Sequence, residues 1–109
     1  MKIDTGIMAK SFAGVGERAK ELEDIGYDGL MTAETSSDPF LPLAVAAVHT
    51  TRVELQTGIA VAFARSPMTT AMTANDLHRE SAGGFILGLG SQIKPHIEKR
   101  FSMCGLIWL

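Results

Sequence analysis

The chain has 109 residues, of which 46% are hydrophobic and 20% are charged, and its formal net charge is −2. These values are typical of one globular domain and exclude a disordered or fibrous protein. The slightly acidic charge gives no electrostatic reason to expect a nucleic-acid or membrane partner, because both attract clustered lysine and arginine. The start of the chain lacks the apolar core of a signal peptide, and no run approaches the ~20 apolar residues of a membrane span, so we expect a cytoplasmic protein.

The first predicted strand, at residues 2–7, is followed by an amphipathic helical pattern. Apolar residues recur there at spacings of three and four, with charged residues between them, which predicts a helix with one buried side. That buried side consists of Phe12, Val15, Ala19 and Leu22. Gly26 follows and is suited to a left-handed C-cap, so we expect the helix to end there.

Two further helices carry matching start signals. Asp38-Pro39 precedes one and Ser66-Pro67 the other, and each pair offers a side-chain acceptor followed by proline at the first helical position. In the helix after Pro67, we expect the methionines to fill the core rather than to contact a cofactor. The predicted buried stripe of that helix is formed by Met68, Ala71, Met72 and Leu77.

Three more apolar segments, at residues 27–33, 53–63 and 85–90, are bounded by glycine, proline or small polar residues and are predicted to be strands. Gly83-Gly84 ends the helix before the last of them, and another helix is predicted to begin near Lys94 or Pro95. Strands that alternate with helices predict parallel pairing and right-handed crossovers, and therefore an α/β fold.

The spacing of the strands fits two architectures. Strand starts repeat roughly every 25 to 32 residues, the size of one βα unit in either a (β/α)₈ barrel or a doubly wound sheet. A complete barrel takes about 250 residues, so four units would form its N-terminal half. Both outer strands of such a half-barrel would be unpaired.

The run FILGLGSQ, residues 85–92, invites comparison with the glycine-rich turn of a dinucleotide-binding fold. That fingerprint needs a third glycine, an acidic residue about 20 positions later and a place in the first βα turn. Here the third glycine is missing, the chain ends at Leu109 with only Glu98 between, and the run follows the fourth strand. A dinucleotide site is therefore not expected. The chain also offers no metal motif, since its single Cys104 and its three histidines, at 49, 78 and 96, lie far apart.

In a (β/α)₈ barrel, the active site is built from the loops that follow the carboxyl ends of the strands. The polar residues at these positions are Lys10, Glu34, Thr35, Asp38, Arg65, Ser91 and Gln92. Structural roles compete with functional ones for some of them, because loop polar groups need hydrogen bonds whatever the function. Asp38 is an expected helix cap, and Arg65 is expected to pair with a carboxylate of a neighbouring loop.

Four ordered motifs in the chain resemble one known family. They are GYDGL at the second strand, DPFLPL at the second helix, ELQTGIAVAFARSP through the third strand and GGFILGLGSQ through the fourth. Together they resemble the luciferase-like monooxygenase family, in particular its branch that uses the deazaflavin coenzyme F420. The resemblance covers residues 1–103 and implies part of a (β/α)₈ barrel. The apolar run CGLIWL at residues 104–109 does not resemble the family, so we interpret it as a divergent tail and the chain as a fragment.

The resemblance also implies site residues. It places a non-proline cis peptide at Gly58-Ile59, with Ala60 directly after it, where the family supports the cofactor ring from behind. Glu34 and Thr35 match a polar pair near the ring and are the predicted catalytic residues, whereas Ser91 and Gln92 match its cofactor-facing wall.

Three functions follow as hypotheses. The first is an F420-dependent oxidoreductase that transfers a hydride between the deazaflavin and a small-molecule substrate. The second is an FMN-dependent monooxygenase. The third is a non-catalytic half-barrel that folds only as a homodimer, because open sheet edges favour pairing. We expect the isolated chain to be inactive, because the family's phosphate contacts come from later strands.

Overall fold

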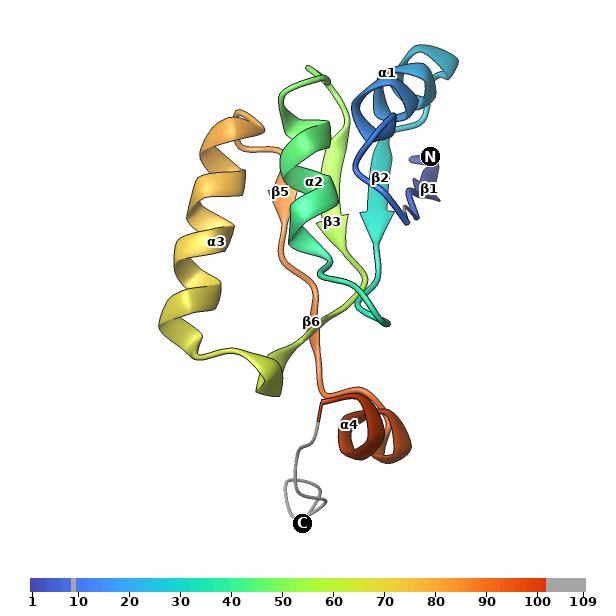
Figure 1. Cartoon of the computed structure of the whole chain (residues 1–109). Coiled ribbons are helices and arrows are strands. Elements are labelled where there is room, and N and C mark those ends of the chain that lie inside the picture. Colours follow the sequence, from blue (N-terminus) through green and yellow to red (C-terminus); the bar gives the residue numbers. More distant parts are fainter. Residues whose placement is uncertain (9, 102–109) are drawn as a thin grey trace.

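The computed structural model describes residues 1–8 and 10–101 (Figure 1). The strands are β1 (Asp4–Gly6), β2 (Gly29–Thr32), β3 (Glu54–Thr57), β4 (Ala60–Val61), β5 (Phe85–Ile86) and β6 (Leu89–Gly90). The helices are α1 (Val15–Ile25), α2 (Phe40–Ala47), α3 (Pro67–Glu80) and α4 (Lys94–Arg100), with a short 3₁₀ turn at Ala62–Ala64. The predicted boundary after Met103, the tail 104–109 and Cys104 lie outside the described residues.

The strands form one main parallel sheet in the order β1-β2-β3-β5. Beyond it, β4 and β6 make a second parallel pair that extends the sheet past its carboxyl end. The predicted alternation of strands and helices with parallel pairing is therefore confirmed. All four predicted strands are shorter than expected, and two of them divide: 53–63 into β3, β4 and the 3₁₀ turn, and 85–90 into β5 and β6.

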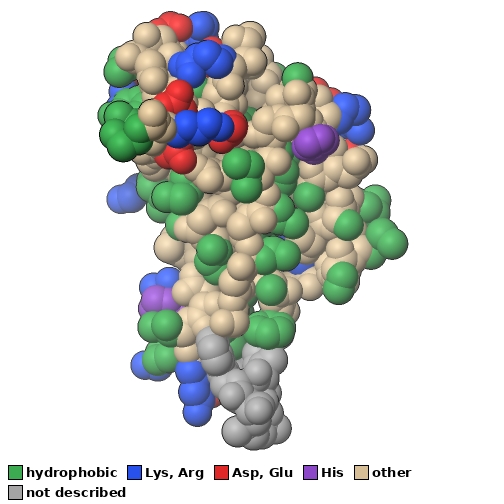
Figure 2. Space-filling model, turned by 180° about the vertical axis from the view of Figure 1, so that it is seen from behind, with side chains coloured by type: hydrophobic (Ala, Val, Ile, Leu, Met, Phe, Trp, Pro, Cys, Tyr) green, Lys and Arg blue, Asp and Glu red, His purple; other side chains and the backbone are tan. Residues whose placement is uncertain are grey.

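Helices α1, α2 and α3 cover one face of the sheet (Figure 1). Leu30, Leu55 and Phe85 share one register row across three strands, and all three are buried among the core residues on that face. The next row, Met31 and Ile86, points to the opposite face because side chains alternate along a strand. Seen from behind, hydrophobic side chains gather over the middle of that second face (Figure 2). No helix in residues 1–8 and 10–101 is long and apolar enough to cross a membrane.

Helix α1 begins later than predicted. Gly14 precedes it in the left-handed conformation, with φ of 80°, and Val15 is its first residue. The prediction that Phe12 lies on the buried side is wrong, because Phe12 falls in the preceding loop and is 52% exposed. Val15, Ala19 and Leu22 are buried as expected, and Gly26 forms the predicted left-handed C-cap.

The start signal of α3 is confirmed, because Ser66 Oγ accepts a hydrogen bond from Thr69 N at 3.1 Å and Pro67 is the first helical residue. Asp38 also caps its helix, since its Oδ1 accepts from Phe40 N at 2.7 Å. Pro39, however, is the residue before α2 rather than its first residue.

The predicted methionine stripe of α3 is wrong. Met68 and Met72 are 70% and 64% exposed, Ala71 is exposed too, and of the predicted four only Leu77 is buried. At 3.6 residues per turn, Met68 lies about 180° around the helix from Leu77. Thr70 is buried with Leu77 instead, and they define the side of α3 that faces the core.

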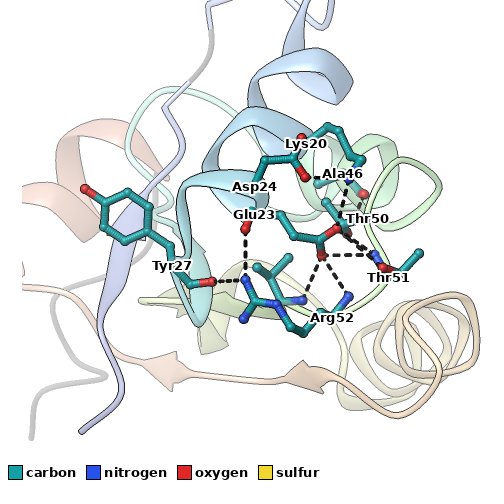
Figure 3. A network of polar contacts seen from close by, with 9 residues as sticks. Lys20, Glu23, Asp24, Tyr27, Ala46, Thr50, Thr51 and Arg52 are labelled. Carbon is teal, nitrogen blue, oxygen red and sulfur yellow. Dashed lines mark hydrogen bonds and ion pairs between the residues drawn. The ribbon is translucent and has the colours of Figure 1, made fainter.

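A buried glutamate joins α1 to the loop before β3, at the amino end of the sheet (Figure 3). Glu23 is 7% exposed, and its carboxylate accepts backbone N–H groups from Thr51 at 3.0 Å, Arg52 at 2.7 Å and Val53 at 3.0 Å. Burial alone would raise the pKa of Glu23, but these hydrogen bonds and the nearby Lys20 charge outweigh it and leave the pKa lowered. The carboxylate thus supplies hydrogen-bond acceptors for three backbone N–H groups of this loop.

Candidate active site

The loops that follow β2, β4 and β6 meet at the carboxyl end of the sheet, the end where α4 lies (Figure 1). Parallel strands bring their carboxyl ends to one edge, so residues far apart in sequence become neighbours there. This edge contains all of the predicted site residues.

Glu34, directly after β2, is the centre of a buried ion pair. Glu34 is only 5% exposed. Arg65 approaches with both terminal nitrogens, Nη1 to Oε2 and Nη2 to Oε1, each at 2.8 Å. Val61 N also donates to Oε2, at 2.6 Å. A two-bond arginine–carboxylate pair of this kind fixes geometry as well as adding attraction.

Arg65 is itself held from two further sides. Its Nη2 donates to Asp38 Oδ2 at 3.0 Å, and its guanidinium carbon lies 5.0 Å from the centre of the Phe40 ring. The hydrogen bond to Glu34, opposed by burial and aided by Asp38, raises the pKa of Arg65. The expectation that Arg65 pairs with a loop carboxylate is confirmed, and it pairs with two.

The segment after β3 runs as the resemblance predicts. The peptide bond between Gly58 and Ile59 is cis, and the cis-peptide prediction is therefore confirmed. Gly58 N donates to Thr32 O at 2.6 Å, and Ala60 N donates to Gly88 O at 2.8 Å. These bonds fix segment 58–61 between the carboxyl end of β2 and the start of β6.

Glycines allow the strands to approach closely at this edge. A Cβ at Gly58 would collide with the sulfur of Met31, and one at Gly90 would lie 2.8 Å from Ile59 Cδ1. A Cβ at Gly88 would collide with the carbonyl oxygen of Thr57. The glycines in the motifs ELQTGIA and FILGLG therefore serve packing between strands, which is a reason for their positions that needs no phosphate ligand.

Gln92 turns its side chain toward the protein. Its Nε2 donates to the backbone oxygen of Glu34 at 3.2 Å, and its Oε1 lies 3.3 Å from His96 Nδ1. Its backbone is left-handed, with φ of 63°, which is uncommon outside glycine. Ser91 beside it is half-buried and its Oγ contacts Gln92 O at 3.3 Å.

Two cavities share the loop that contains Thr35 as part of their lining. The larger has a volume of about 450 Å³ and is lined by Glu34, Thr35, Ser36, Ser37, Asp38, Arg65, Arg100 and Phe101. The smaller, of about 280 Å³, shares the loop 35–38 and adds Ile7, Met8, Lys10, Thr32, Ala33 and Pro42. Thr35 is exposed and borders both cavities, so of the two predicted catalytic residues it is the more accessible.

The structure thus brings Glu34 together with Ile59, Val61 and Gln92, whose contacts it shares. Gly58, Ile59, Ala60, Ser91 and Gln92 do not belong to the lining of either of these two cavities. Sequence reasoning missed Phe40 beneath the guanidinium of Arg65, and Arg100 and Phe101 in the larger cavity. Their signal is weak, because an aromatic residue in an apolar helix and a basic residue at a helix end are both common.

A model of the luciferase-like monooxygenases matches residues 1–105. The chain belongs to this family. An uncharacterized protein of Mycobacterium tuberculosis, strain H37Rv, is 56% identical over 103 residues, which cover 94% of this chain and 30% of that protein. The chain therefore spans about a third of the length of this curated relative.

Several solved structures share the fold. The monooxygenase RslO1 from Streptomyces bottropensis superposes with a TM-score of 0.84 at 25% identity, covering 95% of this chain and 37% of that chain. The coenzyme F420 dependent tetrahydromethanopterin reductase from Methanopyrus kandleri gives 0.76 at 25% identity, covering 91% and 29%. The oxygenating constituent of 3,6-diketocamphane monooxygenase from Pseudomonas putida, solved with FMN, gives 0.78 at 21% identity, covering 90% and 31%. The predicted fold, part of a luciferase-like (β/α) barrel, is confirmed.

Proposed function

We propose that this chain forms the N-terminal wall of the cofactor site of an F420-dependent oxidoreductase. The observation that carries the proposal is segment 58–61, held at the carboxyl end of the sheet by backbone bonds to the ends of β2 and β6. Family membership supports the site's position, and the F420 dependence printed in the reductase's name supports the choice of cofactor.

The residues at this edge suit a flat aromatic ring. Met31, Ile86 and Leu89 expose 39%, 45% and 49% of their surface, and apolar side chains of this kind can pack against a tricyclic ring system. Ser91, which is half-buried, and Thr35, which is exposed, add hydroxyl groups in the loops that follow β6 and β2. We propose that Gly58, Ile59 and Ala60 support the ring, with Ser91 and Gln92 at its edge.

A deazaflavin, when bound, supplies a carbon that accepts or donates a hydride. The chain's own contribution is to orient the ring and to exclude water from one side of it. We propose that Thr35, which is exposed and borders both cavities, exchanges a hydrogen bond with a small-molecule substrate. The substrate itself is proposed only as a small organic molecule that fits beside Thr35.

FMN is the alternative cofactor, and the proposed reaction would then be that of a monooxygenase, in which molecular oxygen is the second reactant. It is supported by the FMN complex of the ketocamphane monooxygenase, at a lower sequence identity than the F420 reductase. The two cofactors present similar ring systems to the same wall, so a direct comparison of binding separates them.

The test is a fluorescence titration of the purified chain with coenzyme F420 and, separately, with FMN. We expect a saturable change with F420 at a Kd on the order of micromolar and a weaker one with FMN. Gly58→Val should abolish the change, because its side chain would collide with Met31. Ile25→Ala, exposed at the end of α1, is the control and should bind as the native chain does. Binding of neither cofactor would contradict the proposal for this chain.

A second candidate is a non-catalytic half-barrel that associates as a homodimer. It is supported by the two outer strands of the main sheet, β1 and β5, and by the apolar side chains exposed on the uncovered face. Light scattering on the purified chain tests it: a dimer that binds neither cofactor would favour this candidate, and a monomer that binds F420 would exclude it.

A further inference from the structure

All hydrogen-bonding groups of Glu34 are engaged with the protein. Its backbone N–H donates to Ile59 O at 3.1 Å, and its backbone oxygen accepts from Gln92 Nε2 at 3.2 Å. Its carboxylate accepts from Val61 N at 2.6 Å and from both terminal nitrogens of Arg65 at 2.8 Å. One residue therefore joins three separate parts of the cofactor wall.

Two of these bonds act on the same short segment. Ile59 O and Val61 N belong to residues two apart, and Glu34 holds the first with its backbone and the second with its carboxylate. Without the carboxylate, the N–H of Val61, a residue that is 1% exposed, would lose its acceptor. The position of segment 58–61 thus depends on the side chain of Glu34 as well as on β-sheet pairing.

Arg65 fixes the direction of that carboxylate. It comes four residues after Val61, so the carboxylate contacts the same stretch of chain at two points. The side chain of Arg65 is 17% exposed and that of Glu34 is 6% exposed, and Asp38 and Phe40 hold the guanidinium from its other sides. Uptake of a proton from a substrate would remove the negative charge that pairs with Arg65.

We propose that Glu34 is a positioning residue, which holds segment 58–61 in place for the cofactor ring, and does not exchange protons with the substrate. This inference rests on the proposed function for the identity of the ring. It assigns Glu34 a different role from the catalytic one that the resemblance implies, and it leaves Thr35 as the polar residue of that pair that can contact a ligand.

Amide hydrogen exchange, followed by NMR on the isotope-labelled chain, tests directly whether the Glu34 carboxylate holds segment 58–61. In Glu34→Ala we expect the Val61 amide to exchange at least ~10-fold faster, because its acceptor is gone, with a smaller increase in Glu34→Gln. The Leu55 amide, which donates to Gly84 O at 2.8 Å within the sheet, should not change. Glu54→Gln is the matched control, a glutamate of the same sheet whose partner is the exposed Lys2.

Cofactor binding gives the second measurement. If Glu34 positions the ring, affinity for F420 should fall in the same order as Val61 protection, and the affinity ratio between native chain and Glu34→Gln should not vary with pH. If Glu34→Ala fails to fold, Arg65→Lys replaces it, because lysine keeps the charge but loses the two-bond geometry; Val61 exchange should then rise by about 3-fold.

Two results would overturn the inference. One is unchanged Val61 exchange in Glu34→Ala, or in Arg65→Lys where that variant replaces it. The other is a Glu34→Gln chain with native Val61 protection whose F420 affinity, relative to that of the native chain, varies with pH, which would identify Glu34 as a group that exchanges protons at the site. If the native chain binds neither cofactor, the proposed function fails, whereas the exchange measurement still decides whether Glu34 holds the segment.

Discussion

Glu23 and Glu34 are both buried glutamates, but they lie at opposite ends of the sheet and have different kinds of partner. Glu23, at the amino end, accepts three backbone N–H groups of one loop. Glu34, at the carboxyl end, pairs with the guanidinium of Arg65 and borders a cavity of about 450 Å³. In a (β/α) barrel the amino end contributes to stability and the carboxyl end to function. The comparison separates a carboxylate that completes a loop of the fold from one that also borders a cavity.

The largest expected effect comes from breaking the pair at the carboxyl end. Arg65→Ala leaves the carboxylate of Glu34 buried without its charged partner, and we expect a loss of about 3 kcal/mol in the free energy of unfolding. Urea denaturation measures it. Arg79→Ala, whose partners Asp76 and Glu80 are exposed, is the control and should cost less than about 0.5 kcal/mol. A cost for Arg65→Ala no larger than the control's would show that the pair adds nothing to stability.

At the amino end, Glu23→Ala should cost about 2 kcal/mol, because three backbone N–H groups lose their acceptor. The same urea experiment compares it with Glu21→Ala on the same helix, where the exposed glutamate forms an ion pair with Arg18. F420 affinity of the folded fraction should be unchanged in Glu23→Ala. Reduced affinity at full folding would contradict the division between the two ends.

The pH dependence of stability sharpens the comparison further. The pKa of Glu23 is lowered in the folded chain, so its contribution is fully present above the unfolded pKa, about 4.5, and is lost as pH falls through the folded value. As the pH falls from about 6 to about 3, the free energy of unfolding of Glu23→Gln should therefore decrease less than that of the native chain. Thermal unfolding, repeated at intervals of about one pH unit, measures this difference. An identical acid loss in both chains would exclude Glu23 as a source of the pH dependence.

The smallest expected effect is at a helix start near the site. Ser66→Ala removes the side-chain acceptor for Thr69 N and should cost about 1 kcal/mol. Asn75→Ala, on the exposed side of the same helix, should be neutral or slightly stabilising because alanine favours helix. If Ser66→Ala also weakens F420 binding, the start of α3 takes part in the site through Arg65, its neighbour in the chain.

Local signals in the sequence were reliable where a single residue type meets a local backbone need. Ser66-Pro67 started a helix, Gly26 ended one, and the alternation of strands and helices gave a parallel sheet. The methionine stripe of α3 failed because Met68 and Met72 fit a helical spacing but lie on its outer side. Which side of a helix faces the core depends on the elements packed against it, and spacing alone leaves that choice open.

In the candidate site, too, local features were predicted from the sequence and long-range contacts were not. The resemblance located Gly58-Ile59, and the expected pairing of Arg65 with a loop carboxylate was correct, yet no local pattern indicated that the carboxylate would be that of the predicted catalytic Glu34. The two residues are 31 positions apart and meet because β2 and β3 are neighbours in the sheet.

The alternation of strands and helices, the caps at Gly26 and Ser66 and the resemblance to the family could be predicted from the sequence, because they depend on residues close together along the chain. Which polar groups remain accessible at the carboxyl edge depends on contacts that form only in the folded chain. Hydrogen-bond partners there come from loops 27 to 58 residues apart, from Asp38 with Arg65 to Gln92 with Glu34, and folding brings them together. Glu34 was predicted as a reactive group, but its carboxylate is held by Val61 N and Arg65, while Thr35, its neighbour, is exposed and borders both cavities.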